Sequence, residues 1–172
     1  MLEVSLKSHL VGMPEIIVQV LLFSIVDPVV ATVGGWWSTL FYIIISNSII
    51  CILIIIGNVF VRFSYITPGL LVIAIQAVMI GWLAGSNGFE IPFKTVADAN
   101  VQYLRIGLWE TTAYALICAV SLPKSLLTSE TFPAKEWLQQ RSFKDIKLSI
   151  DEIIITVLSA IMLISAAIIE DI

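Results

Sequence analysis

The residue with the clearest potential for chemistry is Glu110, a carboxylate placed inside a long apolar segment. The surrounding stretch reads RIGLWETTAYALICAV, residues 105–120. At 100° per residue of helix, Glu110 shares one face with small and polar residues and turns away from a mostly apolar face. The other residues of the polar face are Gly107, Thr111, Tyr114, Cys118 and Ser121. An ionisable group that faces the interior of an apolar helix bundle is a candidate for a substrate, ion or proton pathway.

The alternative role for Glu110 is structural, as a polar contact that holds helices together. Arg105 is the nearest basic residue, but the two positions lie about 140° apart around a straight helix. We therefore do not expect them to pair within this helix, and Arg62 or a backbone amide of another element could be the partner. The structural role is favoured, and the pathway role stays open.

A second polar stripe lies in FYIIISNSIICILIIIGNVFV, residues 41–61. Asn47, Cys51 and Asn58 fall on one narrow stripe, because eleven residues make almost three helical turns. Amide side chains in apolar surroundings seek partners across helix interfaces. We expect Asn47 and Asn58 to join helices, and the alternative is that they line a polar cavity. The residues of a polar path in that alternative would be Asp27, Glu110 and Tyr114.

Motifs of the common enzyme classes are missing from this sequence. The single histidine, His9, cannot form a histidine-based metal site or a catalytic triad alone. Gly34-Gly35 precedes two tryptophans rather than a Lys-Ser or Lys-Thr pair, so the phosphate-binding loop motif is not met. Asp151-Glu152 lies at the start of an apolar segment, where acidic residues favour the helix dipole. We expect a non-enzymatic protein that uses no cofactor or metal and binds no nucleic acid.

The composition indicates the class of protein that must position these residues. Of the 172 residues, 59% are hydrophobic and 13% are charged, and the mean hydropathy is +1.01. A soluble domain has about 25% charged residues and 45–50% apolar ones. This excess of apolar residues predicts one integral membrane domain, residues 1–172, because a small water-soluble core could not bury them. The fold class is all-α, a polytopic transmembrane helix bundle.

The chain has room for about five spans of ~20 residues. In the first, Asp27-Pro28 is expected to bend or end the helix, which leaves open whether residues 29–33 cross the membrane or re-enter it. The pattern Ser149-Ile-Asp-Glu152 predicts a capping box at the start of the last span. The expected spans are 16–33, 41–61, 68–85, 104–122 and 150–169.

Two further features concern packing and the membrane surface. Gly69, Ala77, Gly81 and Gly85 recur at multiples of four and predict close approach of another helix. Residues 133–148 could form a short interfacial helix with apolar residues toward lipid and basic residues toward headgroups. Its apolar residues would be Trp137, Leu138 and Ile146, and its basic residues Lys135, Arg141, Lys144 and Lys147.

The distribution of lysine and arginine predicts an orientation in the cell membrane. With five spans, seven basic residues share one side and only Lys94 and Arg105 lie on the other. This bias places the N-terminus in the cytoplasm and the C-terminus outside.

The order of these features resembles the stage II sporulation protein M family of polytopic membrane proteins. That family has an asparagine in an early span, a glycine-rich following span, and a later span that opens with a Pro-His-Gly-x-x-Glu-like motif. Arg105 and Ile106 stand here in place of the proline and histidine, whereas Gly107 and Glu110 remain. The other residues that carry the resemblance are Asn47, Gly57, Gly81, Gly85, Asn87 and Gly88.

The resemblance implies a membrane scaffold, because the member in spore formers recruits enzymes that remodel peptidoglycan. Because the histidine is replaced, it favours a packing or capping role for Gly107 and Glu110. We therefore expect a scaffold or subunit of a membrane complex that contacts the lipid bilayer and other membrane subunits or a second copy of itself. The alternative function is a component of a transporter, channel or ATPase-driven exporter with a polar path near Glu110.

Overall fold

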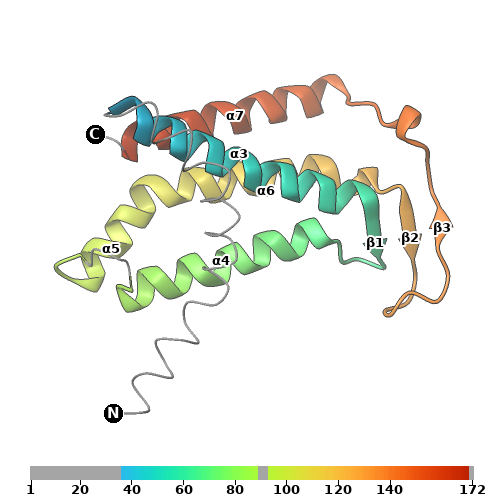
Figure 1. Ribbon diagram of the computed structural model, residues 1–172, viewed down its shortest axis with the longest axis horizontal. Helices are drawn as coiled ribbons and strands as arrows, with labels where there is room; N and C mark the ends of the chain where they lie inside the picture. The colour runs from blue at the N-terminus through green and yellow to red at the C-terminus, as the bar shows by residue number, and fades with distance from the viewer. Residues whose placement is uncertain (1–35, 89–92, 171–172) are drawn as a thin grey trace, which may run out of the picture. The chain divides into compact units, whose positions relative to one another are not determined.

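The computed structural model describes residues 36–88 and 93–170 of the chain (Figure 1). Of these, 36–46 belong to one compact unit and consist of the beginning of a helix, whereas 47–170 form a second unit. The first expected span, 16–33, and its residue Asp27 lie outside the described residues.

The described chain is mostly helical. Its helices are α3 (Trp36–Phe60), α4 (Pro68–Ser86), α5 (Val96–Gln102), the π-helical turn η1 (Tyr103–Gly107), α6 (Leu108–Ser121), the 3-10 turn η2 (Leu122–Lys124) and α7 (Ile150–Glu170). Four stretches are long and apolar enough to cross a membrane: Leu40–Phe60, Pro68–Ser86, Val96–Lys124 and Ile150–Ile169. They correspond to four of the five spans expected from the sequence.

The third of these stretches begins earlier than the expected residue 104. Thr95 caps α5, because its hydroxyl oxygen accepts from the Asp98 backbone N–H at 3.2 Å and its own N–H donates to Asp98 Oδ2 at 3.1 Å. Reciprocal bonds of this kind stabilise a helix start. Helix then continues through η1 into α6, so Glu110 lies midway along Val96–Lys124 instead of near the start of a span.

The two other helix starts in the second unit also have caps. Thr67 precedes Pro68 of α4, and its hydroxyl accepts from the Leu70 N–H at 3.1 Å. Ser149 and Glu152 exchange two bonds at the start of α7, which confirms the capping box expected there.

The core of the second unit lies where α3, α4, α6 and α7 meet. Its buried centre consists of Cys51 and Ile54 from α3 and of Tyr114, Ile117 and Cys118 from α6. Side chains from α4 and α7 pack against this centre, namely Val72, Ile73 and Leu163. Figure 1 shows α6 and α7 side by side, and Lys124 of η2, directly after α6, forms a 2.7 Å ion pair with Glu152 of α7.

Three short strands form a small sheet at the end of this unit opposite α5 (Figure 1). They are β1 (Val61–Phe63), β2 (Leu127–Ser129) and β3 (Leu138–Gln139). β1 runs parallel to β2 with Arg62 opposite Thr128, and β3 runs antiparallel to β2 with Leu138 opposite the same threonine.

The prediction of an interfacial helix at 133–148 is wrong. Leu138 and Gln139 pair with β2 instead. Ser142 and Asp145 form a capping box at the start of the 3-10 turn η3 (Phe143–Asp145). The ring of Trp137, expected to face lipid, packs edge-on against Phe63 at a centroid distance of 5.2 Å. Strand pairing and aromatic contacts with β1 and β2 therefore replace helical hydrogen bonds in this segment.

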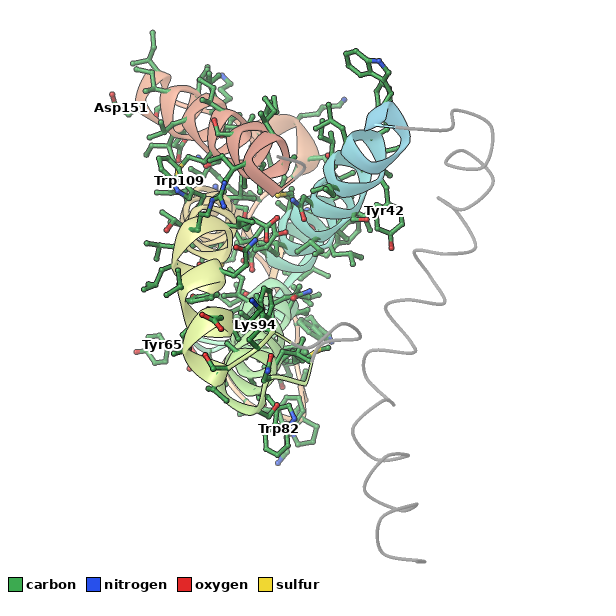
Figure 2. All side chains as sticks on the ribbon, turned by 90° about the vertical axis from the view of Figure 1, so that its left-hand side faces the viewer. Tyr42, Tyr65, Trp82, Lys94, Trp109 and Asp151 are labelled. Carbon is green, nitrogen blue, oxygen red and sulfur yellow. The ribbon has the colours of Figure 1, made fainter. Side chains whose placement is uncertain are left out.

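Large apolar side chains cover the outside of the four long helices. Exposed examples on α4 and α7 include Val78, Trp82, Ile154 and Ile161. Figure 2 shows Trp82 projecting away from α4 and Tyr65 projecting from the turn before it. Apolar surface of this extent is typical of helices that contact lipid or another apolar protein surface.

Candidate functional site

Glu110 is joined to α3 through one amide side chain. Asn47 Nδ2 donates to Glu110 Oε1 at 2.8 Å, and the Tyr114 hydroxyl donates to Asn47 Oδ1 at 2.7 Å. Asn47 is 7% exposed and Tyr114 is 3% exposed, so the amide is bonded at both ends in the interior. We call Asn47, Glu110 and Tyr114 the Glu110 cluster; it places Glu110 on the inward face, as the helical pattern indicates.

Neither arginine considered from the sequence neutralises Glu110. Arg105 is exposed, and Arg62 lies in β1 with a buried Nε that has no hydrogen-bond partner among the described residues. Within residues 36–88 and 93–170, one ion pair between side chains is formed, and it joins Lys124 to Glu152. The partner of Glu110 is thus a neutral donor, and its charge has no cation beside it in the described chain.

A second polar cluster joins α3, α4 and α6 three turns further along α3. Asn58 is fully buried; its Nδ2 donates to Ser121 Oγ at 2.8 Å and to Cys118 Sγ at 3.3 Å. Its Oδ1 accepts a short hydrogen bond from the hydroxyl of Thr67, which is also fully buried. We call Asn58, Thr67, Cys118 and Ser121 the Asn58 cluster, in which one amide links three helices.

The chain after α6 satisfies the carbonyls at the end of α3. The Ser125 hydroxyl donates to the Asn58 carbonyl at 2.8 Å, and the Leu126 N–H donates to the Val59 carbonyl at 2.7 Å. The last carbonyls of a helix have no partner within the helix and need one from elsewhere. These bonds fix the end of α3 against the segment that leads into β2.

Two glycines allow α3 and α4 to approach at the same level as the Asn58 cluster. A Cβ atom at Gly69 would overlap the Ile54 carbonyl oxygen and Asn58 Oδ1, and one at Gly57 would overlap the backbone of Gly69. By contrast, no described atom lies within 4 Å of a Cβ built at Gly81 or Gly85. The glycine row of α4 thus splits into an inner contact at Gly69 and an open pair further along.

A cavity of about 260 Å³ borders the Glu110 cluster. It is bounded by the last turns of α4, by α5 and by η1, and Glu110 is the one acidic or basic residue among the described residues that line it. Two aromatic residues, Phe93 and Tyr103, also line it, and most of the remaining walls are apolar.

Two residues singled out from the sequence hold these aromatic residues in place. Asn87 clamps the Phe93 backbone: its Nδ2 donates to the Phe93 carbonyl at 2.7 Å, and its Oδ1 accepts from the Phe93 N–H at 3.0 Å. Gly107 makes room for the Tyr103 ring, because a Cβ there would lie 2.5 Å from Tyr103 Cδ2. Gly107 and Glu110 therefore line one cavity, and Asn87 bonds the backbone of a third lining residue, Phe93.

The π-helical turn η1 contributes three of the residues that line this cavity, Tyr103, Ile106 and Gly107. At its end, the Leu108 N–H donates to the Tyr103 carbonyl, five residues earlier. Turns of this kind occur frequently at functional sites, where they change the direction of side chains. Sequence patterns did not reveal η1, because its residues read as continuous apolar helix.

The site also includes residues that sequence reasoning missed. Thr67 gave one signal, since a threonine directly before a proline is a common helix start. Phe93, Gln102 and Tyr103 gave none, because aromatic and amide residues in a connection have many roles. Cys51 and Cys118 are free and buried, and no group of three His, Cys, Asp or Glu within the described ranges could hold a metal.

Comparison with protein-family models, with curated proteins and with solved structures finds no match. The resemblance to the stage II sporulation protein M family therefore rests on the residues that carry it. Two of them, Gly107 and Glu110, line the Glu110 cavity, and Asn87 bonds the backbone of Phe93, which also lines it. Asn47 binds Glu110, and Gly57 lies at the α3–α4 contact.

Proposed function

We propose that this chain is a multi-pass protein of the cell membrane that acts as a scaffold or subunit of a membrane complex and catalyses no reaction. The four span-length apolar helices support insertion into a bilayer. The Asn58 and Glu110 clusters support a fixed interior, because interhelical hydrogen bonds and glycine contacts restrict how the helices can move. A fixed bundle with an open helix face suits assembly with other membrane helices.

The observation that carries this proposal is the open face of α4. Among the described residues, only 11% of the span window of α4 is buried, the smallest share of the four helices. Gly81 and Gly85 lie on this helix, and no described atom lies within 4 Å of a Cβ built at either. Glycines at this spacing allow a second helix to approach closely in a membrane. The partner would be a helix of another membrane subunit or of a second copy of the chain.

The mass of the protein after mild solubilisation tests this proposal. Native mass spectrometry from nanodiscs is expected to give a stoichiometric particle heavier than the 19.0 kDa chain. The reason is that the open α4 face would be covered by a protein helix. A particle that contains one chain and lipid alone, over a range of lipid compositions, would rule out assembly.

The Lys/Arg bias and the family resemblance supply the remaining details of the proposal. The basic residues after α6 support a cytoplasmic location for the 123–148 segment, with the N-terminus on the same side and the C-terminus outside. The resemblance supports a scaffold role without extending it to sporulation.

A second candidate function is that of a transporter or channel component, and the Glu110 cavity favours it. An ionisable residue in the middle of an apolar span is expected to mark a pathway when solvent or ligand can reach it. Reconstitution of the purified chain alone in liposomes separates the two functions. Flux of an ion or solute that a Glu110→Gln variant abolishes would support transport and contradict a purely scaffolding role.

A further inference from the structure

The Glu110 cavity has a composition that suits one class of ligand. Its volume of about 260 Å³ exceeds the ~150 Å³ of an engineered protein cavity that holds benzene. A ligand of about ten non-hydrogen atoms would fit such a space. Its walls are mostly apolar, and Glu110 is the one acidic or basic side chain among the described residues that line it.

An ionised Glu110 would be stabilised by a cation, and the described chain places none beside it. Asn47 donates one hydrogen bond to Oε1, but a carboxylate can accept several bonds through its two oxygens. Arg105 is exposed, and the Lys124 side chain is committed to Glu152. A charge in apolar surroundings is costly unless an opposite charge compensates it.

The aromatic walls favour an organic cation over a metal ion. Phe93 and Tyr103 line the cavity together with Glu110. Aromatic rings attract ammonium groups and contact their apolar substituents at the same time. Hard metal ions instead need several oxygen ligands, and this cavity offers one carboxylate beside the polar groups of Gln102 and Tyr103.

Two residues outside the Glu110 cluster help to position these aromatic residues. Asn87 holds the Phe93 backbone through two hydrogen bonds, and Gly107 leaves the space that the Tyr103 ring occupies. Neither arrangement takes part in anchoring Glu110, because its carboxylate accepts from Asn47, and Asn47 in turn accepts from the Tyr114 hydroxyl. The cavity is therefore shaped by residues other than those that anchor its carboxylate.

We propose that the Glu110 cavity binds a small organic ammonium ion, with its positive charge at Glu110 and its apolar substituents against Phe93 and Tyr103. This inference goes beyond the scaffold proposal, since ligand binding and assembly are separate properties of the chain. It also does not require transport, because a bound cation could remain in the cavity.

Binding of phenyltrimethylammonium to the full chain in detergent micelles tests the proposal. We expect saturable binding by calorimetry, weakened at least tenfold in Glu110→Gln. The glutamine retains an oxygen that can accept from Asn47, so the unliganded thermal midpoint is expected to stay close to that of the wild type. Tyr103→Leu is expected to weaken binding about threefold to thirtyfold, the range typical of cation–π contacts.

Two controls make the outcome decisive. Glu130→Gln is the same chemical change at an exposed position near the sheet and is expected to leave binding unchanged. tert-Butylbenzene has the same shape without the charge and is expected to bind at least tenfold more weakly. Absence of saturable binding, equal binding by wild type and Glu110→Gln, or equal binding of the neutral compound would overturn the proposal.

The Tyr103→Leu result decides the question if Glu110→Gln does not fold. An unchanged affinity for phenyltrimethylammonium in a folded Tyr103→Leu protein would then reject the site. Native mass measured on the same samples reports assembly separately, so loss of the complex and loss of the cation site are distinguishable.

Discussion

Replacement of Asn58 by alanine is expected to lower the free energy of unfolding by about 2–3 kcal/mol. The change leaves the hydroxyl of Thr67 without the oxygen to which it donates and removes the donor to Ser121. Buried polar groups without a partner cost about 1–3 kcal/mol each, whereas a side-chain bond between membrane helices contributes on average ~0.6 kcal/mol. The expected loss is smaller than the full cost of two unpaired buried groups, because the hydroxyls of Thr67 and Ser121 can also donate to backbone carbonyls.

Asn100 provides the matched control for this measurement. It is an exposed asparagine whose side chain bonds the Val96 carbonyl of its own helix at 2.8 Å. Asn100→Ala is expected to change stability by less than about 0.5 kcal/mol. Titration with sodium dodecyl sulfate in mixed micelles measures both variants, and equal losses in the two would show that Asn58 does not join the three helices.

Substitution of Gly69 by alanine is the second change with a large expected effect, a loss of about 1–3 kcal/mol. The new methyl group would overlap the Ile54 carbonyl and the side-chain oxygen of Asn58. Backbone atoms cannot turn away as a flexible side chain can, so α4 must move from α3. That movement would also stretch the bond between Thr67 and Asn58.

Gly85→Ala is the control on the same helix. Its added methyl group meets no described atom within 4 Å, and alanine favours a helix over glycine by roughly 0.5–1 kcal/mol. The isolated chain is therefore expected to keep or slightly raise its thermal midpoint in Gly85→Ala while Gly69→Ala lowers it. If both variants have the same midpoint, the close α3–α4 contact is absent.

Much of the helical framework could be predicted because it depends on local sequence. Apolar length located the four long helices, and the Ser149–Glu152 pattern located the start of α7. The inward face of Glu110 followed from helical periodicity alone. The start of the third span at Val96, ahead of the expected residue 104, could not be found in this way. Its cap, Thr95 with Asp98, lies in a polar connection.

The partners in the site could not be predicted, since they depend on how helices far apart in sequence align. Asn47 and Glu110 are separated by 63 residues, as are Asn58 and Ser121. The conformation of the 133–148 segment could not be predicted for the same reason. Its amphipathic pattern is real, but pairing with β2 and the contact of Trp137 with Phe63 decide its conformation.

The two polar clusters divide the interior of the second unit into regions with different consequences. The Asn58 cluster and the glycine contact bring three helices together at one level of the bundle. The Glu110 cluster lies three turns away along α3 and borders a cavity. A change at Asn58 should therefore affect stability first, whereas a conservative change at Glu110 should affect ligand binding first.

Site-directed photo-crosslinking at Gly81 in native membranes tests the proposed assembly most directly. A photoreactive phenylalanine derivative at Gly81 is expected to yield one discrete adduct larger than the 19.0 kDa chain by the mass of a protein subunit. The same derivative at Ile154, exposed on α7, serves as the comparison site and is expected to react mainly with lipid. Lipid adducts alone at Gly81, with the same pattern as at Ile154, would contradict the account.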